Sequence, residues 1–162
     1  MEIPPPPYVG LYGSHSGDWR AVAIERLNKS GIACYDPTDP AWGRINETTG
    51  DRLQPEIDTL VAKQHSGLIG AACVVFHLAR RKARDGVTSD TDVTAALAAR
   101  CELGFLTGRG IRTFVHIEPD VEGRNYLWAQ IALYDHMKRC NTLDAAVLDA
   151  IAYINAMVEL RR

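Results

Sequence analysis

The sequence predicts an α/β fold built on a parallel β-sheet, and three observations lead to this prediction. Short apolar runs recur along the chain and end at Gly, Pro or Asp. The segments between them carry apolar residues at the three- and four-residue spacing of amphipathic helices. The longest run, Ala71–Ala79, is continuously apolar, which is typical of a parallel strand covered on both faces. We therefore expect a Rossmann-like or flavodoxin-like three-layer sandwich, with a parallel sheet of about four to five strands.

The expected elements follow from these runs and from the residues that interrupt them. Gly13 stops the first strand, Asp36-Pro37 closes the second, and Gly31 ends the first helix. Two stretches without periodicity, 38–50 and 80–91, are expected to be loops, and long loops in compact domains are usually functional. In chain order we expect strands at Tyr8–Tyr12, Ile32–Tyr35, Ala71–Ala79 and Ile111–Ile117, and helices at Asp18–Lys29, Asp51–Gly70, Asp92–Thr107, Asn125–Lys138 and Thr142–Leu160.

Length and charge limit the classes of protein to consider. With 162 residues the chain is the size of one domain, which we place at 8–162 after a Pro-rich lead-in at 1–7. The formal charge is -2, from 18 basic and 20 acidic residues, so a nucleic-acid polymer is not an expected partner. No apolar segment approaches the ~20 residues that span a bilayer, so no membrane partner is expected. The lead-in has prolines where a signal peptide would be apolar, and we expect a cytoplasmic protein.

Candidate binding residues follow the carboxyl ends of the expected strands, where ligands of α/β sheets bind. Gly13, Ser14 and His15 belong to a small-residue turn that opens a helix, and such a turn presents backbone N–H groups to an anion. The turn has neither the dinucleotide-binding glycine spacing nor the lysine of a P-loop. The plainer interpretation is a capped strand-to-helix turn. Asp36 and Trp42 flank the corresponding segment after the second strand, and this segment can equally be a rigid turn.

Glu102 is the candidate catalytic residue. It lies in a helical stretch that leads into the apolar strand Ile111–Ile117, so its carboxylate can be aimed at a cleft at the edge of the sheet. A single helical glutamate is more often solvated surface, but its neighbours Cys101, Leu103 and Phe105 are expected to be buried and favour a buried position for Glu102. The histidines have no ligand spacing with one another or with cysteine, so no metal site is expected. No nucleophile elbow is present.

Together these segments resemble the nucleoside 2-deoxyribosyltransferase family and the related nucleoside 5'-monophosphate N-glycosidases. The likeness covers roughly residues 9–119 and rests on four blocks that occur in the order of the family. These are Gly10–Ser14 with Asp18–Arg20, Tyr35–Pro37 with Asp39–Trp42, the helix that carries Glu56 and Asp58, and Glu102–Gly104 followed by Gly108–Arg112. The chain departs from the family where relatives have an aspartate six residues before the nucleophile, since Ala96 stands there.

The resemblance implies a role for each candidate residue. Glu102 would attack the anomeric carbon of the sugar, and Asp58 or Asp92 would hold or protonate the leaving base. Gly13, Ser14 and His15, with Arg20 nearby, would hold the 5' end of the sugar or a 5'-phosphate. The remaining substrate-binding candidates are Tyr12 and Trp42 as stacking partners of the base, Asp36 in the Asp-Pro block, and Asn125 as a contribution from a neighbouring subunit.

The resemblance also implies partners and leaves alternatives open. The substrates would be a small-molecule nucleoside or nucleotide and a free base, no cofactor is needed, and the protein would be a homodimer or a larger homo-oligomer. The leading interpretation is a 2-deoxyribosyltransferase. Its rivals are an N-glycosidase in which water replaces the acceptor base, a non-catalytic nucleotide-binding or sensor module, and a flavodoxin-like domain with an unrelated ligand.

Overall fold

The protein is a three-layer α/β sandwich with a five-stranded, all-parallel sheet in the order β2-β1-β3-β4-β5. The computed structural model describes residues 2–14, 17–38, 54–79 and 90–161, and for 90–98 it describes the backbone alone. The strands are β1 (Val9–Gly13), β2 (Cys34–Tyr35), β3 (Cys73–Leu78), β4 (Thr113–Ile117) and β5 (Met137–Arg139). The helices are α1 (Trp19–Lys29), α3 (Gln54–Ile69), α4 (Asp90–Arg109), α5 (Arg124–Ile131) and α6 (Leu143–Glu159).

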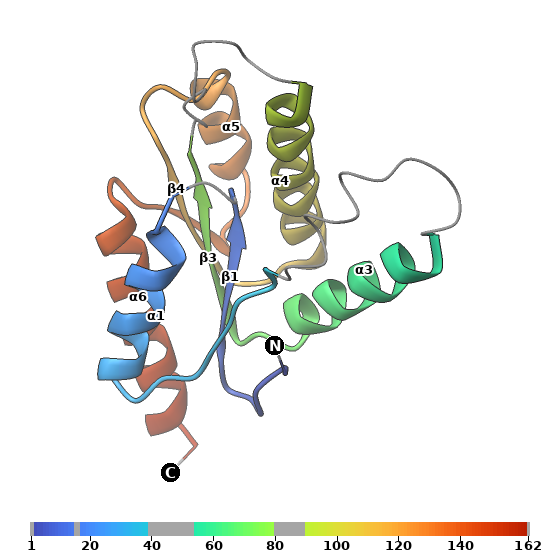
Figure 1. The fold of residues 1–162 in the computed structure, drawn as a ribbon. Coiled ribbons are helices and arrows are strands. Elements are labelled where there is room, and N and C mark those ends of the chain that lie inside the picture. Colours follow the sequence, from blue (N-terminus) through green and yellow to red (C-terminus); the bar gives the residue numbers. More distant parts are fainter. Residues whose placement is uncertain (1, 15–16, 39–53, 80–89, 162) are drawn as a thin grey trace.

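The two faces of the sheet are covered by different helices, so the predicted fold class is confirmed (Figure 1). Helices α1 and α6 pack on one face through Leu27 and Val147 against Val75. Helices α3, α4 and α5 lie on the other face, where Leu106 packs in the same cluster as Phe76. All six residues of β3 are buried, as expected for a central strand between two helical layers.

One expected helix is shorter in the structure, and part of its expected range forms a strand instead. The helix expected at Asn125–Lys138 ends at Ile131, and Met137–Arg139 instead forms the edge strand β5 beside β4. Only Met137 of these three residues is buried, where it joins the core cluster that contains Trp128 of α5. Such a short strand has no alternating pattern that could reveal it. Helix α4 begins at Asp90, two residues earlier than expected.

The connectivity sets the position of the site. From β1 the chain runs through α1 to β2 on one side, while from β3 it runs through α4 to β4 on the other. The strand order therefore reverses between β1 and β3, and the carboxyl ends of strands at such a reversal flank the usual ligand crevice of α/β sheets. Gly13 and His77 are paired across β1 and β3 at this end.

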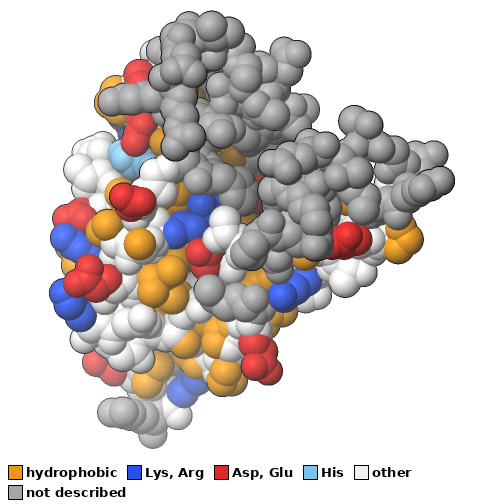
Figure 2. Space-filling view, in the orientation of Figure 1, with side chains coloured by type: hydrophobic (Ala, Val, Ile, Leu, Met, Phe, Trp, Pro, Cys, Tyr) orange, Lys and Arg blue, Asp and Glu red, His pale blue; other side chains and the backbone are white. Residues whose placement is uncertain are grey.

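Figure 2 shows acidic and basic side chains interspersed over the described part of the visible face, consistent with the small net charge.

Candidate active site at the ends of β1 and β3

Glu102 lies at the carboxyl end of β1, although it belongs to the helix that follows β3. Ala99, Leu103 and Leu106 of α4 are buried in the core, and their packing holds this face of the helix against the sheet. Glu102 is partly buried beside them, and its Oε2 accepts a hydrogen bond from the backbone N–H of Gly13 at 3.2 Å. The candidate nucleophile is thereby fixed to the first residue of the predicted binding turn.

The environment changes the acidity of Glu102. Burial raises the pKa of its carboxyl group to about 7, while the Gly13 N–H and the positive charge of Arg20 act in the opposite direction. A carboxyl group in an apolar setting, with a pKa near the working pH, is typical of catalytic acids, bases and nucleophiles. A surface glutamate without these neighbours would be ionised throughout the neutral range.

A cleft of about 280 Å³ opens beside Glu102. It lies between α3 and α4, with β1 behind it. The lining residues are Tyr12 of β1, Gln64, His65 and Leu68 of α3, and Cys101, Glu102 and Phe105 of α4. On both helices the lining positions have the spacing i, i+1 and i+4, which places them on one face of each helix. Sequence reasoning missed Gln64, His65, Cys101 and Phe105 as lining residues, and Cys101, expected to be buried, is exposed. Any helical residue has neighbours at i+1 and i+4, so the sequence carries no signal that would have singled these positions out.

Two ring contacts shape the outer part of the cleft. The rings of His65 and Phe105 are stacked, with centroids 4.9 Å apart and an interplanar angle of 24°. The guanidinium of Arg109 lies 5.4 Å from the centroid of Phe105. Deeper in the cleft, the hydroxyl group of Tyr12 donates a hydrogen bond to the carbonyl of Gln64 at 2.7 Å. The cleft thus joins a carboxylate to an aromatic wall, a combination suited to a sugar that carries a planar ring.

The turn after β1 is held by its own side chains and by the end of β3. The backbone N–H of Ser14 donates to the carbonyl of His77 at 2.8 Å. The Ser14 hydroxyl donates to the carbonyl of Ala79 at 3.2 Å and accepts from its N–H at 2.9 Å. Trp19 Nε1 donates to the carbonyl of Ser14 at 2.7 Å. The Ser14 side chain, predicted to bind substrate, therefore binds the neighbouring strand end.

Arg20 is buried and braces the same turn. Its Nη1 donates to the Ser14 carbonyl at 2.7 Å and its Nη2 to the Gly13 carbonyl at 3.0 Å. Its Nε lies 3.2 Å from Oδ1 of Asp36, an ion pair whose angle falls outside hydrogen-bond geometry. Burial lowers the pKa of Arg20, and the charges of Asp36 and Glu102 oppose this effect. Two predicted substrate ligands, Arg20 and Asp36, are thus paired with each other.

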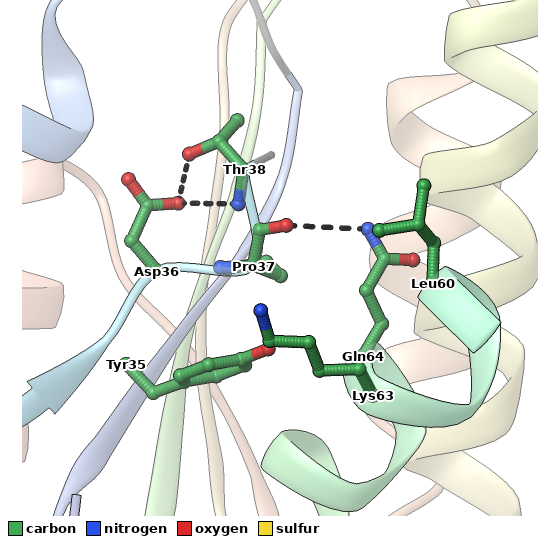
Figure 3. A pocket seen from close by; sticks show the side chains of 7 residues that line it. All are labelled: Tyr35, Asp36, Pro37, Thr38, Leu60, Lys63 and Gln64. Carbon is green, nitrogen blue, oxygen red and sulfur yellow. Dashed lines mark hydrogen bonds between the residues drawn. The ribbon is translucent and has the colours of Figure 1, made fainter. Parts of the chain in front are cut away.

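A second, much smaller cavity of about 10 Å³ lies between the end of β2 and α3 (Figure 3). This volume is about that of one water-sized probe, too small for a substrate. Asp36 accepts hydrogen bonds here from the N–H of Thr38 at 2.9 Å and from its hydroxyl group. Gln64 Nε2 donates to the carbonyl of Pro37 at 3.4 Å. These contacts tie the segment after β2 to α3, and so fix the helix that carries one wall of the larger cleft.

Two histidines lie side by side at the same end of the sheet, on the face covered by α1. Nδ1 of His77 and Nδ1 of His116 are 2.9 Å apart, so one ring donates and the other accepts. The Trp19 ring lies 5.2 Å from that of His77, and Nε2 of His77 is 3.6 Å from Oε1 of Glu118, beyond hydrogen-bond distance. Burial, the His116 ring and the Arg20 charge lower the pKa of His77 to about 4. Burial, aided by Arg124, also lowers the pKa of His116.

The lowered pKa of His77 predicts that this residue makes the protein less stable in mild acid. The unfolded chain takes up a proton on His77 near pH 6.5 and the folded protein only near pH 4, so the contribution of His77 to the free energy of unfolding falls as the pH drops through this window. The shift corresponds to about 3 kcal/mol for His77. Urea unfolding of the wild type and His77→Phe at several pH values between 7.5 and 4.5 isolates this contribution, because the other titrating groups act equally in both proteins. The free energy of unfolding of the variant, relative to the wild type, should rise as the pH falls. A difference that does not change with pH would contradict the prediction.

The structure does not bring every predicted residue to the cleft. Asp58 is exposed on α3, where Gln54 Nε2 donates to its carboxylate at 2.7 Å, and it does not line the cleft. Asn125 is exposed on α5 and does not line it either. His15 and Trp42 lie outside the described residues. Asp92 is on α4, but its side chain is outside the described part of the chain.

Comparison of the chain with family models, with curated proteins and with solved structures found no match. In the described segments, no helix combines the length and apolar character needed to cross a lipid bilayer. Among the same residues, no three His, Cys, Asp or Glu side chains come together as a metal ion would require. The assignment of a function therefore depends on the geometry of the cleft beside Glu102.

Proposed function

We propose that the protein cleaves the N-glycosidic bond of nucleosides and transfers the sugar to a second base, as nucleoside 2-deoxyribosyltransferases do. The observation that carries the proposal is the Glu102 carboxylate, which lines a cleft with an aromatic wall and is hydrogen-bonded to the end of β1. A carboxylate held in this way can attack an anomeric carbon and stabilise the oxocarbenium-like transition state that precedes bond formation.

The position of Glu102 supports covalent catalysis in two ways. The Gly13 N–H fixes one carboxylate oxygen, so the side chain is oriented before the substrate arrives. Burial leaves the charged form of this carboxyl group poorly solvated and raises its pKa, and a poorly solvated carboxylate is a stronger nucleophile towards a developing cation.

The contacts of Ser14 and Arg20, which belong to the described part of the turn and the helix after it, favour unphosphorylated nucleosides over nucleoside monophosphates. The Ser14 hydroxyl and two donor nitrogens of Arg20 would be natural ligands of a 5'-phosphate. They are instead bonded to Ala79 and to the carbonyls of Gly13 and Ser14. A phosphate would have to displace these bonds. The N-glycosidase that acts on monophosphates is therefore the second candidate.

The test is base release from a panel of 2'-deoxynucleosides and their 5'-monophosphates, each with and without an acceptor base. Exchange that requires the acceptor supports the transferase. Release without an acceptor that is fastest on monophosphates supports the hydrolase. An absence of turnover across the panel would refute both and leave a binding module.

The pKa of Glu102 predicts the pH dependence of this reaction. Nucleophilic attack requires the ionised carboxylate, so the acidic limb of kcat/KM against pH should be centred at about 7. A surface carboxylate would give a limb near 4.3. The measurement is kcat/KM for one deoxynucleoside between pH 5 and 9, with protein stability checked at each pH. A rate that is flat from pH 5.5 upward would contradict a role for a buried Glu102.

A further inference from the structure

The proposed reaction needs a proton donor for the leaving base, and the expected donor on α3 is misplaced. Asp58 is exposed, bonded to Gln54, and absent from the cleft lining. His65 stands seven residues further along the same helix, which is two turns or about 10 Å, and it does line the cleft. Asp58 and His65 thus lie on the same face of α3, and His65 is the one that lines the cleft.

The setting of His65 suits a donor that acts on a planar ring. Its imidazole is exposed, so it can exchange protons with solvent. Stacking on Phe105 fixes the plane of the imidazole, and Phe105 lies three residues after Glu102, on the same side of α4. His65 and Glu102 therefore belong to facing walls of one cleft, as the two partners of an acid-assisted displacement must.

The other described lining residues with a titratable proton are poorer candidates. The hydroxyl of Tyr12 is bonded to the Gln64 carbonyl, and burial strongly raises the pKa of this tyrosine. Cys101 carries a thiol, which is a weak hydrogen-bond donor. Imidazole is the side chain that both gives and takes a proton near neutral pH.

We propose that His65 is the general acid that protonates the leaving base while Glu102 attacks the sugar. This inference rests on the proposed function. A Glu102 oxygen forms a bond to C1' as the bond from C1' to the base nitrogen breaks, and the electron pair of that bond stays with the base. The proton of the His65 imidazolium moves to a ring nitrogen of the base, which leaves neutral. In the second half, water or an acceptor base attacks C1', releases Glu102, and gives its proton to the neutral His65.

The test compares two nucleosides whose bases differ in their need for a proton. The base of 2'-deoxyguanosine must be protonated to leave readily, whereas the base of 7-methyl-2'-deoxyguanosine is already cationic. His65→Phe keeps a ring against Phe105 but removes the proton. We expect this variant to lose about 10²- to 10⁴-fold in kcat/KM on 2'-deoxyguanosine, and less than about tenfold on the methylated nucleoside. Asp58→Asn, a matched change on the same helix, should leave both rates unchanged.

The Glu102→Gln variant tests the proposed function independently of His65. It should lose activity on both nucleosides, because both reactions need the nucleophile. If Glu102→Gln is impaired and His65→Phe is not, the inference is wrong and the proposed function stands. Equal losses on the two nucleosides for His65→Phe would show a structural role and also overturn it. The inference is also overturned if Asp92→Asn loses kcat/KM on 2'-deoxyguanosine but not on the methylated nucleoside, while His65→Phe keeps the wild-type rate on both. A wild-type protein that releases the base from no nucleoside of the panel described above refutes both proposals.

Discussion

Replacing Glu102 with glutamine should reduce base release at least about a thousandfold and, at pH 8, make the protein more stable. Glutamine has nearly the same shape as glutamate, and its carbonyl oxygen can still accept the Gly13 N–H. It cannot form the covalent bond to the sugar. Removal of a covalent nucleophile typically costs several orders of magnitude in rate, far more than loss of a binding contact.

The expected gain in stability follows from the direction of the pKa shift. Below about pH 4.5 Glu102 is neutral in both the folded and the unfolded chain, and its ionisation costs nothing. Between pH 4.5 and 7 the unfolded chain ionises first, so the folded state becomes relatively less stable as the pH rises. Above pH 7 the full cost is present, about 2 kcal/mol after allowance for partial exposure.

The two effects are measured on the same protein preparations. Urea unfolding of the wild type and Glu102→Gln should give a stability difference near zero at pH 4.5 that grows in favour of the variant towards pH 8. Base release is assayed at pH 8 on the preferred nucleoside. An activity loss below about tenfold would exclude covalent catalysis by Glu102. A variant less stable than the wild type at pH 8 would show that the carboxylate is well solvated.

The layers of the fold were predictable from the sequence because each central strand is marked by its own residues. The apolar run at 71–79 contains β3, and the turn residues Gly13 and Asp36 stand directly at the ends of β1 and β2. The edge strand β5 was not predictable. Its pairing to Thr113–Val115 is a long-range contact, and its three residues carry no periodic signal.

The candidate site was predictable only in part, for a related reason. The sequence places Glu102 on a helix and Gly13 in a turn, but their contact depends on how α4 packs across β1. Arg20 and Asp36 both belong to candidate binding segments, yet in the folded chain the two charges are paired. The cleft-lining positions of α3 and α4 become a wall only when the two helices face each other. Pairings of this kind arise from tertiary packing, which local patterns do not specify.

The Gly13→Ala substitution tests the contact on which the site is built, and it should be the most destabilising single change in this region. Gly13 has a φ of +113°, which L-residues with a side chain rarely adopt. A Cβ atom there would lie 2.1 Å from the carbonyl oxygen of His77. That oxygen cannot easily move, because it accepts the Ser14 N–H and belongs to the β1–β3 ladder. We expect a loss of more than about 3 kcal/mol, or about 10 °C in Tm.

Gly17→Ala is the matched control for this prediction, because the same turn contains both glycines. Gly17 also has a positive φ, +79°, but among the described residues no atom lies within 4 Å of where its Cβ would be. Its substitution should therefore lower the free energy of unfolding only by the strain of a positive φ, about 1 kcal/mol. Thermal unfolding of the two variants separates strain from steric contact. Equal losses would mean that the close approach to His77 is not what requires glycine. A much larger loss at Gly13, together with reduced base release in the folded fraction, would show that the close contact between β1 and β3 places the N–H that orients Glu102.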